Sequence, residues 1–486
     1  MIEQATRFEA VIGLEVHVEL STRTKMFCGC ATDFGGEPNT RTCPVCLGQP
    51  GSLPVTNRAA VESAIRLGLA LGCAIAPSSE FHRKNYFYPD MPKNYQISQY
   101  DVPICGRGEL EIPLSGGDTR RVGITRVHME EDTGKSLHVG TSGRIHGADY
   151  SLIDYNRAGI PLLEVVSEPD LRAADEARAY LAELRAVVRA LDISDARLEE
   201  GSMRCDANIS LRPVGHTVFG TRVEVKNMNS LRSLGRAIDY EIDRQTDLLT
   251  AGDRVVQETR HWDEDAGATS TLRAKEEVFD YRYFPEPDLV PVEADAAWVE
   301  ELRAALPELP AVTRQRLTEQ HHIPAEQVAT LVEADLVALL EDAVRSGAGA
   351  GEAANWLTNE VIGWAVGHGV PPAEAPIDGR ALAELVGLVR DGTLSTKLAR
   401  QVLEDVLAGA GSPSAVVRER GLEQISDTGE LAALVDLAII ENAAAADQVR
   451  AGNARAIGAL VGAVMKASKG QANPRMVNEL LRERLA

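Results

Sequence analysis

The segment GLEVHVEL, residues 13–20, decides the fold class of the N-terminal half because it alternates apolar and polar side chains. Successive side chains of an extended strand point to opposite faces, so Glu15, His17 and Glu19 would share one face. Such a strand suits an antiparallel sheet with one face on a core and the other open to water. Taken alone, a half-exposed strand of this kind is ordinary and indicates no function.

Three further segments repeat this mixture of acidic, basic and imidazole side chains. With the residues that would share the polar face, they are 126–130 (Arg126, His128, Glu130), 204–212 (Arg204, Asp206, Asn208, Ser210) and 222–226 (Arg222, Glu224, Lys226). If the four strands belong to one sheet, its polar face suits Mg²⁺ and the phosphates of ATP. The chain has neither a GxxxxGK[ST] loop nor a GxGxxG turn that opens a helix, so the nucleotide would lie on the sheet face.

The first 290 residues contain short alternating segments separated by Gly, Pro, Asn and Asp clusters, a pattern typical of strands and turns. Amphipathic helices are expected near 173–191 and 230–249. Because strands dominate and β-α-β alternation is scarce, the expected class is α+β with a largely antiparallel sheet. The composition then becomes typical of helices. The expected domains are 1–295, 296–410 and 411–486.

Composition and charge limit the possible classes of protein. The 486 residues are 44% hydrophobic and 25% charged, and no apolar run approaches the ~20 residues needed to span a bilayer. The N-terminus lacks the pattern of a signal peptide, so we expect a cytoplasmic protein without a membrane partner. Fifty basic and 72 acidic residues give a net charge of −22, which disfavours binding of nucleic acid unless basic residues gather locally.

Basic residues do gather in the last 39 positions, 448–486. The seven cations there, opposed only by Glu479 and Glu483, are Arg450, Arg455, Lys466, Lys469, Arg475, Arg482 and Arg484. The segment 466–474 would join two helices, the second beginning with Asn473 as its cap and proline at its first position. Its lysines and the free amides of that helix could bind phosphates, but for a run of charges taken alone a solvated helical face is the favoured interpretation.

Four of the seven cysteines cluster as Cys28-x-Cys30 and Cys43-Pro-Val-Cys46. Two close cysteine pairs around a loop supply four thiolates, the ligand set of a tetrahedral structural zinc site. The alternative, four small buried apolar residues, fits four cysteines within nineteen residues less well.

Two other stretches allow two interpretations each. The aromatic and basic residues of 83–96 could bind nucleic acid by stacking, although their spacing favours packing of a loop over the sheet. The turn 226–230 could receive a phosphate on its free amides, or its Asn229 or Ser230 could simply cap the following helix.

Longer motifs identify a resemblance. They are VIGLEVHVEL, RKNYFYPDMPKNYQISQ, ITRVHMEEDTGKS, DYNRAGIPLLEVVSEPD, EEGSMRCDANIS, VEVKNMNS, DYRYFPEPDLVP and, in the tail, QISD and MKASKGQANP. In sequence and order they resemble the B-subunit family of tRNA-dependent amidotransferases. The resemblance implies a cradle similar to glutamine synthetase followed by two small helical domains, the last binding tRNA. It also implies a heterotrimer with an amidase-type A subunit and a small C subunit.

The implied activity is that of a carbon–nitrogen ligase with glutamine as amido donor. ATP would phosphorylate the side-chain carboxylate of Glu-tRNA(Gln) or Asp-tRNA(Asn), and ammonia released by the A subunit would displace the phosphate. Activation is needed because a carboxylate has no adequate leaving group, whereas an acyl phosphate has one.

The resemblance also assigns roles to residues. The Mg²⁺ and ATP set is Glu15, His17, Glu130, Glu164 and Asp206, with Arg204, Asn208 and Lys226 beside the nucleotide. Lys84, Lys93 and Glu131 match residues at an ammonia tunnel. The four cysteines match the zinc-containing members, and Lys466, Lys469 and Arg475 would contact tRNA.

Two rival classes remain open. A small-molecule ATP-dependent amide ligase would need neither the basic tail nor tRNA, and a non-catalytic tRNA-binding scaffold would not need the carboxylate-bearing strands.

Overall fold

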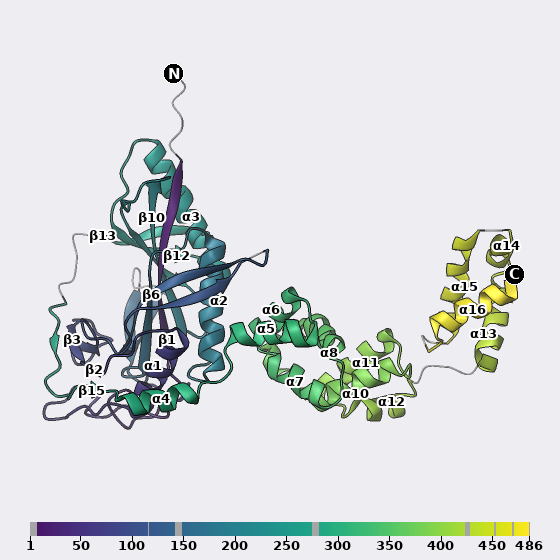
Figure 1. Cartoon of the computed structure of the whole chain (residues 1–486), viewed down its shortest axis with the longest axis horizontal. Helices are drawn as coiled ribbons and strands as arrows, with labels where there is room; N and C mark the ends of the chain where they lie inside the picture. Colours follow the sequence, from purple (N-terminus) through teal and green to yellow (C-terminus); the bar gives the residue numbers. More distant parts are fainter. Residues whose placement is uncertain are drawn as a thin grey trace, which may run out of the picture. The chain divides into compact units, whose positions relative to one another are not determined.

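The computed structural model describes residues 7–114, 116–140, 148–274, 281–422, 428–451, 453–468 and 471–485. The chain divides into two compact units, Met1–Pro310 and Ala311–Ala486 (Figure 1). The described part of the first unit combines a large sheet with helices, and that of the second is helical. The expected combination of a largely antiparallel sheet with a helical C-terminal region is therefore confirmed.

One eight-stranded sheet forms the centre of the first unit. In spatial order its strands are β13 (Ala268–Ala274), β12 (Glu258–Asp263), β11 (Val223–Met228), β10 (Met203–Pro213), β1 (Phe8–Glu19), β9 (Pro161–Ser167), β6 (Thr119–Glu131) and β5 (Gly108–Pro113). All neighbouring pairs are antiparallel except β11 and β12, which are parallel. The motif of residues 13–20 thus lies in β1, between two hydrogen-bonded neighbours.

Two helices cover the apolar face of this sheet. They are α2 (Ala174–Ala190) and α3 (Leu231–Thr250), which lie beside each other (Figure 1). Leu14 and Val16 of β1 are at most 1% exposed and share one core with the buried stripes of both helices. The expected helices near 173–191 and 230–249 are confirmed. Ser230 caps α3 by accepting a hydrogen bond from the backbone amide of Ser233, so the capping interpretation of this turn is the one observed.

Short strands complete the first unit, together with α1 (Arg58–Ala70). β3 (His82–Asn85) pairs with β4 (Tyr95–Ser98) and β14 (Phe284–Pro285), β2 (Ser78–Ser79) pairs with β15 (Val292–Glu293), and β7 (Lys135–Gly140) pairs with β8 (Ala148–Asp154). β14 and β15 thus return from the end of the unit to segments near residue 80.

Helix α4 (Ala296–Ala304) belongs to the first unit by its packing. Its Trp298, Val299 and Leu302 pack against the core of the sheet unit, and the Arg58 guanidinium lies 4.9 Å from the centre of the Trp298 ring. The expected boundary at 295 therefore lies one helix before the observed division at Pro310.

The described helices of the second unit surround two cores. The helices around the first are α5 (Pro310–His321), α6 (Ala325–Glu333), α7 (Val337–Arg345), α8 (Ala350–Trp356), α9 (Ile362–His368), α10 (Gly379–Arg390), α11 (Thr396–Leu407) and α12 (Pro413–Arg420). Those around the second are α13 (Thr428–Glu441), α14 (Ala443–Arg450), α15 (Ile457–Ala467) and α16 (Pro474–Leu485). Because Val416 and Val417 of α12 belong to the first core, the expected division at 411 also falls one helix before the second core. Within the described residues, no helix is both long and apolar enough to cross a membrane.

We expect a fragment of residues 1–310 to be more stable than a fragment of residues 1–295. Loss of α4 uncovers apolar core surface, and two or three partly buried apolar side chains are worth roughly 2–4 kcal/mol. With an unfolding entropy of about 2.1 cal/mol/K per residue, that loss should lower the melting temperature of a domain of this size by about 3–6 °C. Equal melting temperatures in thermal unfolding would show that α4 does not stabilise the first unit.

Candidate functional site

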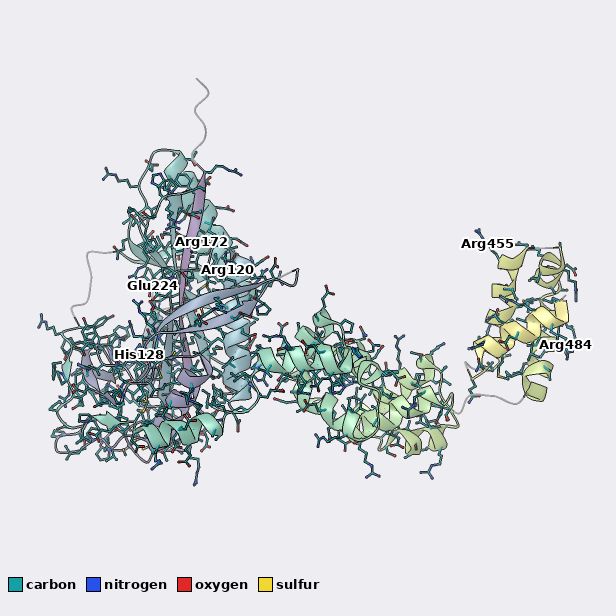
Figure 2. All side chains as sticks on the ribbon, viewed as in Figure 1. Arg120, His128, Arg172, Glu224, Arg455 and Arg484 are labelled. Atoms are coloured by element: carbon teal, nitrogen blue, oxygen red, sulfur yellow. The ribbon has the colours of Figure 1, made fainter. Side chains whose placement is uncertain are left out.

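The strand register places four polar side chains in one row across the sheet. Arg204 of β10 lies opposite His17 of β1, and His17 lies opposite Glu164 of β9. On the far side of β9, Glu164 lies opposite His128 of β6. Figure 2 labels His128 and also Glu224, which lies on β11 of the same sheet. Strands that are far apart in sequence thus bring their polar faces together.

Glu164 lies between the two histidines of this row. Its Oε2 lies 3.3 Å from His17 Nε2 and 3.5 Å from His128 Nε2. Potential ligand atoms of His17, Glu130 and Glu164 all lie within 4.8 Å of one another. Two carboxylates and an imidazole could hold a divalent cation; the carboxylates suit Mg²⁺, whereas imidazole is more common with transition metals.

Burial and neighbouring charges shift the pKa values of this centre in different directions. Burial would raise the pKa of Glu164, but His128, His17 and Lys84 hold it well below its ordinary value. Burial alone would lower the pKa of His17, but its hydrogen bond to Glu164 and the nearby carboxylates raise it above the ordinary value. Burial lowers the pKa of His128 despite its acidic neighbours. The Glu164 carboxylate is therefore held in its charged form, as a cation ligand must be.

Glu15 and Asp206 lie beside this group and have other partners. Asn208 Nδ2 donates to Glu15 Oε1 over 2.9 Å. Lys226 forms ion pairs with Asp206 and with Glu224, the latter at 3.0 Å. Burial raises the pKa of Glu15, and the carboxylates of Glu164, Glu224 and Asp206 add to the shift. Of the five expected Mg²⁺ ligands, three converge in the structure and these two lie at their side.

The Arg204 end of the row adjoins Asp132, Arg157 and Glu19, which the sequence analysis did not assign to the site. Arg204 Nη2 lies 2.6 Å from Asp132 Oδ2, and Arg157 Nε lies 3.7 Å from the same oxygen. Burial, together with Asp132, raises the pKa of Glu19 to about 8. The available signals were the position of Asp132 directly after Glu131 and the presence of Arg157 in the motif DYNRAGIP.

Two adjacent carboxylates at the end of β6 have different lysine partners. Neighbouring residues of a strand point to opposite faces. Glu130 faces Lys84, whose Nζ lies 4.0 Å from Glu130 Oε2, and this oxygen also accepts a hydrogen bond of 3.1 Å from Ser98. Glu131 instead pairs with Lys93. The expected group of Lys84, Lys93 and Glu131 is thus split over the two sides of the strand.

Basic and aromatic residues of the stretch 83–96 pack within the unit. The Arg83 guanidinium donates to both carboxylate oxygens of Glu286, over 2.7 and 2.8 Å. It also lies 4.2 Å from the centre of the Tyr95 ring. For these residues, the loop-packing interpretation is the one observed.

The four cysteines Cys28, Cys30, Cys43 and Cys46 form one cluster, with all four sulfur atoms within 4.8 Å of one another. Cys43 Sγ and Cys46 Sγ are 3.9 Å apart, close to the ~3.8 Å between sulfurs of a tetrahedral zinc site with Zn–S bonds of about 2.3 Å. The hydrogen bond with Cys28 lowers the pKa of Cys46 to about 5, helped by the Cys43 amide and the Lys25 ammonium and opposed by burial. The cluster is therefore suited to a metal such as zinc.

The tail places two of its three expected tRNA contacts at the surface. Lys466 is exposed at the end of α15, and the Arg475 side chain is 89% exposed and lies 3.3 Å from Glu479. Lys469 lies outside the described residues. The Asn473 side chain caps α16 by accepting from the amides of Arg475 and Met476, over 3.0 and 3.3 Å, as expected. Arg455 and Arg484 lie in the same group of helices (Figure 2).

The matches to known proteins cover nearly the whole chain. A family model described as the GatB/GatE catalytic domain matches residues 10–300, and one described as the GatB domain matches residues 338–485. The chain is 57% identical to the B subunit of the aspartyl/glutamyl-tRNA(Asn/Gln) amidotransferase of Thermobifida fusca, over 98% of this chain and 94% of that protein. The protein of the same name from Moorella thermoacetica is 52% identical, over 98% of this chain and 100% of its own length.

We expect one zinc ion per chain, bound by the four-cysteine cluster. Replacing Cys43 or Cys46 with Ser should abolish stoichiometric zinc, because structural sites need all four thiolates. Elemental analysis of chelator-washed protein measures this directly. The matched control is Cys73→Ala, which removes a buried thiol of the sheet core and should leave one zinc per chain. Wild-type protein without zinc would contradict the assignment.

Proposed function

Because the chain belongs to the family of aspartyl/glutamyl-tRNA(Asn/Gln) amidotransferase B subunits, we propose that it is the ligase subunit of such an enzyme. It would use ATP to activate the side-chain carboxylate of Glu-tRNA(Gln) or Asp-tRNA(Asn) and give Gln-tRNA(Gln) or Asn-tRNA(Asn). The single observation that carries this proposal is the convergence of His17, Glu130 and Glu164 on one sheet face, with cationic side chains beside them.

The reaction requires two displacements. In the first, a carboxylate oxygen of the aminoacyl group attacks the terminal phosphorus of ATP, and ADP leaves with the electron pair of the broken P–O bond. In the second, ammonia attacks the acyl carbon, inorganic phosphate leaves with the electrons of the C–O bond, and the nitrogen loses a proton. The first step needs compensation of phosphate charge, and the second needs a proton acceptor.

The sheet face supplies groups for the first displacement. Glu15, His17, Glu130, Glu164 and Asp206 would hold Mg²⁺ and the nucleotide, with Arg204, Asn208 and Lys226 beside the phosphates. When bound, Mg²⁺ neutralises charge that develops on the phosphate oxygens. Lys226 and Arg204 are already anchored by Asp206 and Asp132, so little side-chain freedom is lost when a phosphate approaches.

The end of β6 would serve the second displacement. Lys93 and Glu131 would line the route of ammonia on one side of β6, and Lys84 would lie at its end on the side of the sheet site. Glu131 could accept a proton from ammonium. Ammonia would come from glutamine hydrolysed by an amidase-type A subunit, with a small C subunit completing a cytoplasmic heterotrimer. The buried Lys93–Glu131 pair supports this role because it provides a proton acceptor shielded from bulk water.

The remaining parts would support these steps. The sheet would form a cradle similar to glutamine synthetase, zinc in the cysteine cluster would stabilise the fold, and the C-terminal domain, expected at 411–486, would bind tRNA. The exposed Lys466 and the amides at the start of α16 support the last role.

Replacing His17 or Asp206 with Ala should lower ATP-dependent amidation at least about 100-fold, because each change removes a charge contact at the site of phosphoryl transfer. The measurement is the rate of Gln-tRNA(Gln) or Asn-tRNA(Asn) formation by the purified complex with co-expressed A and C subunits. Glutamine hydrolysis by the A subunit should persist, which shows that the complex still assembles.

The matched control is Glu9→Gln, which changes a carboxylate of β1 that pairs with Arg212 and lies outside the row. It should leave the rate within about twofold. Normal amidation by both site variants would refute the proposed site. Phosphate release from ATP by the wild type without misacylated tRNA would instead favour a small-molecule amide ligase.

The double variant Lys466→Ala/Lys469→Ala should raise the KM for aminoacyl-tRNA and leave ATP binding intact. Contacts with phosphates position the tRNA without reading its bases, and removal of each such contact should make the dependence of log Kd on log salt shallower by about one. The measurement is tRNA affinity of the assembled complex at several salt concentrations.

The charge-matched control, Arg58→Ala/Arg121→Ala, removes two exposed cations of the first unit. It should leave both affinity and slope close to those of the wild type. Equal affinity and slope for the lysine variant and this control would show that the two lysines do not hold the tRNA.

A further inference from the structure

The buried side chain of Lys93 lies against residues that flank the cysteine cluster. Gly48, two residues after Cys46, has φ +65° and faces Lys93 without a side chain of its own. A Cβ atom at Gly48 would collide with Lys93 Cγ and lie 3.1 Å from Lys93 Cα. Since protein interiors are close-packed, a shift of this turn must displace Lys93.

A residue beside the first cysteine pair also lies near Lys93. Phe27 directly precedes Cys28, is 4% exposed, and has its ring centre 6.0 Å from Lys93 Nζ. The Tyr95 ring lies 5.3 Å from the same ammonium. These contacts leave the Lys93 side chain only 5% exposed, with its charge held by Glu131. Residues adjacent to both cysteine pairs therefore pack around this ion pair.

In space, Gly159 lies between Glu131 and the cysteine cluster. A Cβ atom at Gly159 would lie 3.4 Å from Lys25 Cδ, 3.6 Å from Cys46 Cβ and 3.8 Å from Glu131 Oε2. Lys25 is fully buried; its Nζ donates to the Arg41 and Tyr155 carbonyls, over 2.8 and 3.1 Å, and lies 3.9 Å from Cys46 Sγ. Lys25 thereby joins the loop that carries Cys43 and Cys46 to the backbone at Tyr155, four residues before Gly159.

We propose that the four-cysteine cluster positions the Lys93–Glu131 ion pair, so that metal loading controls the ammonia side of the reaction and leaves the nucleotide side unaffected. Lys84 and Glu130, which face the sheet site, provide the contrast, because their contacts are with Ser98 and the Tyr281 ring. The functional part rests on the proposed function. The positional part concerns metal retention alone and can be tested separately.

Coupling of this kind is reciprocal, so removal of the Lys93 stem must weaken retention of the metal by as much as the metal favours the native position of Lys93. In the purified complex, Lys93→Ala should bind zinc about 10-fold less tightly than wild type in equilibrium competition with a colorimetric chelator. Lys93→Met keeps the packing and should restore the wild-type affinity. Lys84→Ala should also keep the wild-type affinity.

A second pair of variants tests the reaction. Gly48→Ala should displace Lys93 and lower the amide formed per phosphate released at least fivefold, with tRNA-dependent phosphate release retained. Gly51→Ala is the matched control, because Gly51 has a similar φ of +83° but no atom within 4 Å of its added Cβ. It should leave the yield of amide per phosphate unchanged.

The proposal is overturned if Lys93→Ala binds zinc as tightly as Lys84→Ala, or if Gly48→Ala and Gly51→Ala give the same yield. Absence of tRNA-dependent phosphate release in the wild type would refute the proposed function instead, and the comparison of zinc affinities would still decide whether the cluster positions Lys93.

Discussion

The central strand β1 forms hydrogen bonds with β10 along one edge and with β9 along the other, and the site depends on the register of these two pairings. Because side chains alternate along a strand, a slip of one residue would turn His17 into the core and Val16 into water. The apolar residues of β1 thus hold its polar residues in place. Burial beneath α2 and α3 fixes the register, and the register aligns Arg204, His17 and Glu164.

Pairing with opposite charges explains how charged side chains are tolerated at low exposure in the assembled sheet. A carboxylate removed from water is costly unless partners compensate its charge. Glu164 has two imidazoles, Asp132 has two arginines, and Glu131 has Lys93. Each partner comes from a different segment of the chain, so the charges can be satisfied only once the sheet is assembled. The charge pairs of the site therefore form only in the folded sheet, and they in turn stabilise that fold.

Much of this arrangement could be predicted from local patterns. The alternation in residues 13–20 predicted a strand with Glu15 and His17 on one face, and the spacing in 173–191 predicted α2. The cysteine spacing predicted the cluster. These features depend on periodicity or on short loops, which a single sequence displays directly.

Other features depend on contacts between distant segments and could not be read locally. The strand order that places Glu164 between His17 and His128 arises only when β9 pairs with β1 on one side and β6 on the other. The different partners of Glu130 and Glu131 follow from the path of residues 84–98 around the end of β6. Helix α4 has a helical composition like the segment after it, and only its packing on α1 assigns it to the first unit.

The late strands β14 and β15 have a consequence for synthesis of the protein. They pair with β3 and β2, and the Arg83–Glu286 contact joins residues 203 positions apart in the chain. Contacts of such separation form slowly because a long loop must first close. During synthesis on the ribosome, β3 lacks its partner β14 until residue 285 has emerged, and only its pairing with β4 can form before then. The helices after α4 are then still being made, so the first unit can complete its fold, α4 included, before the second unit has been synthesised.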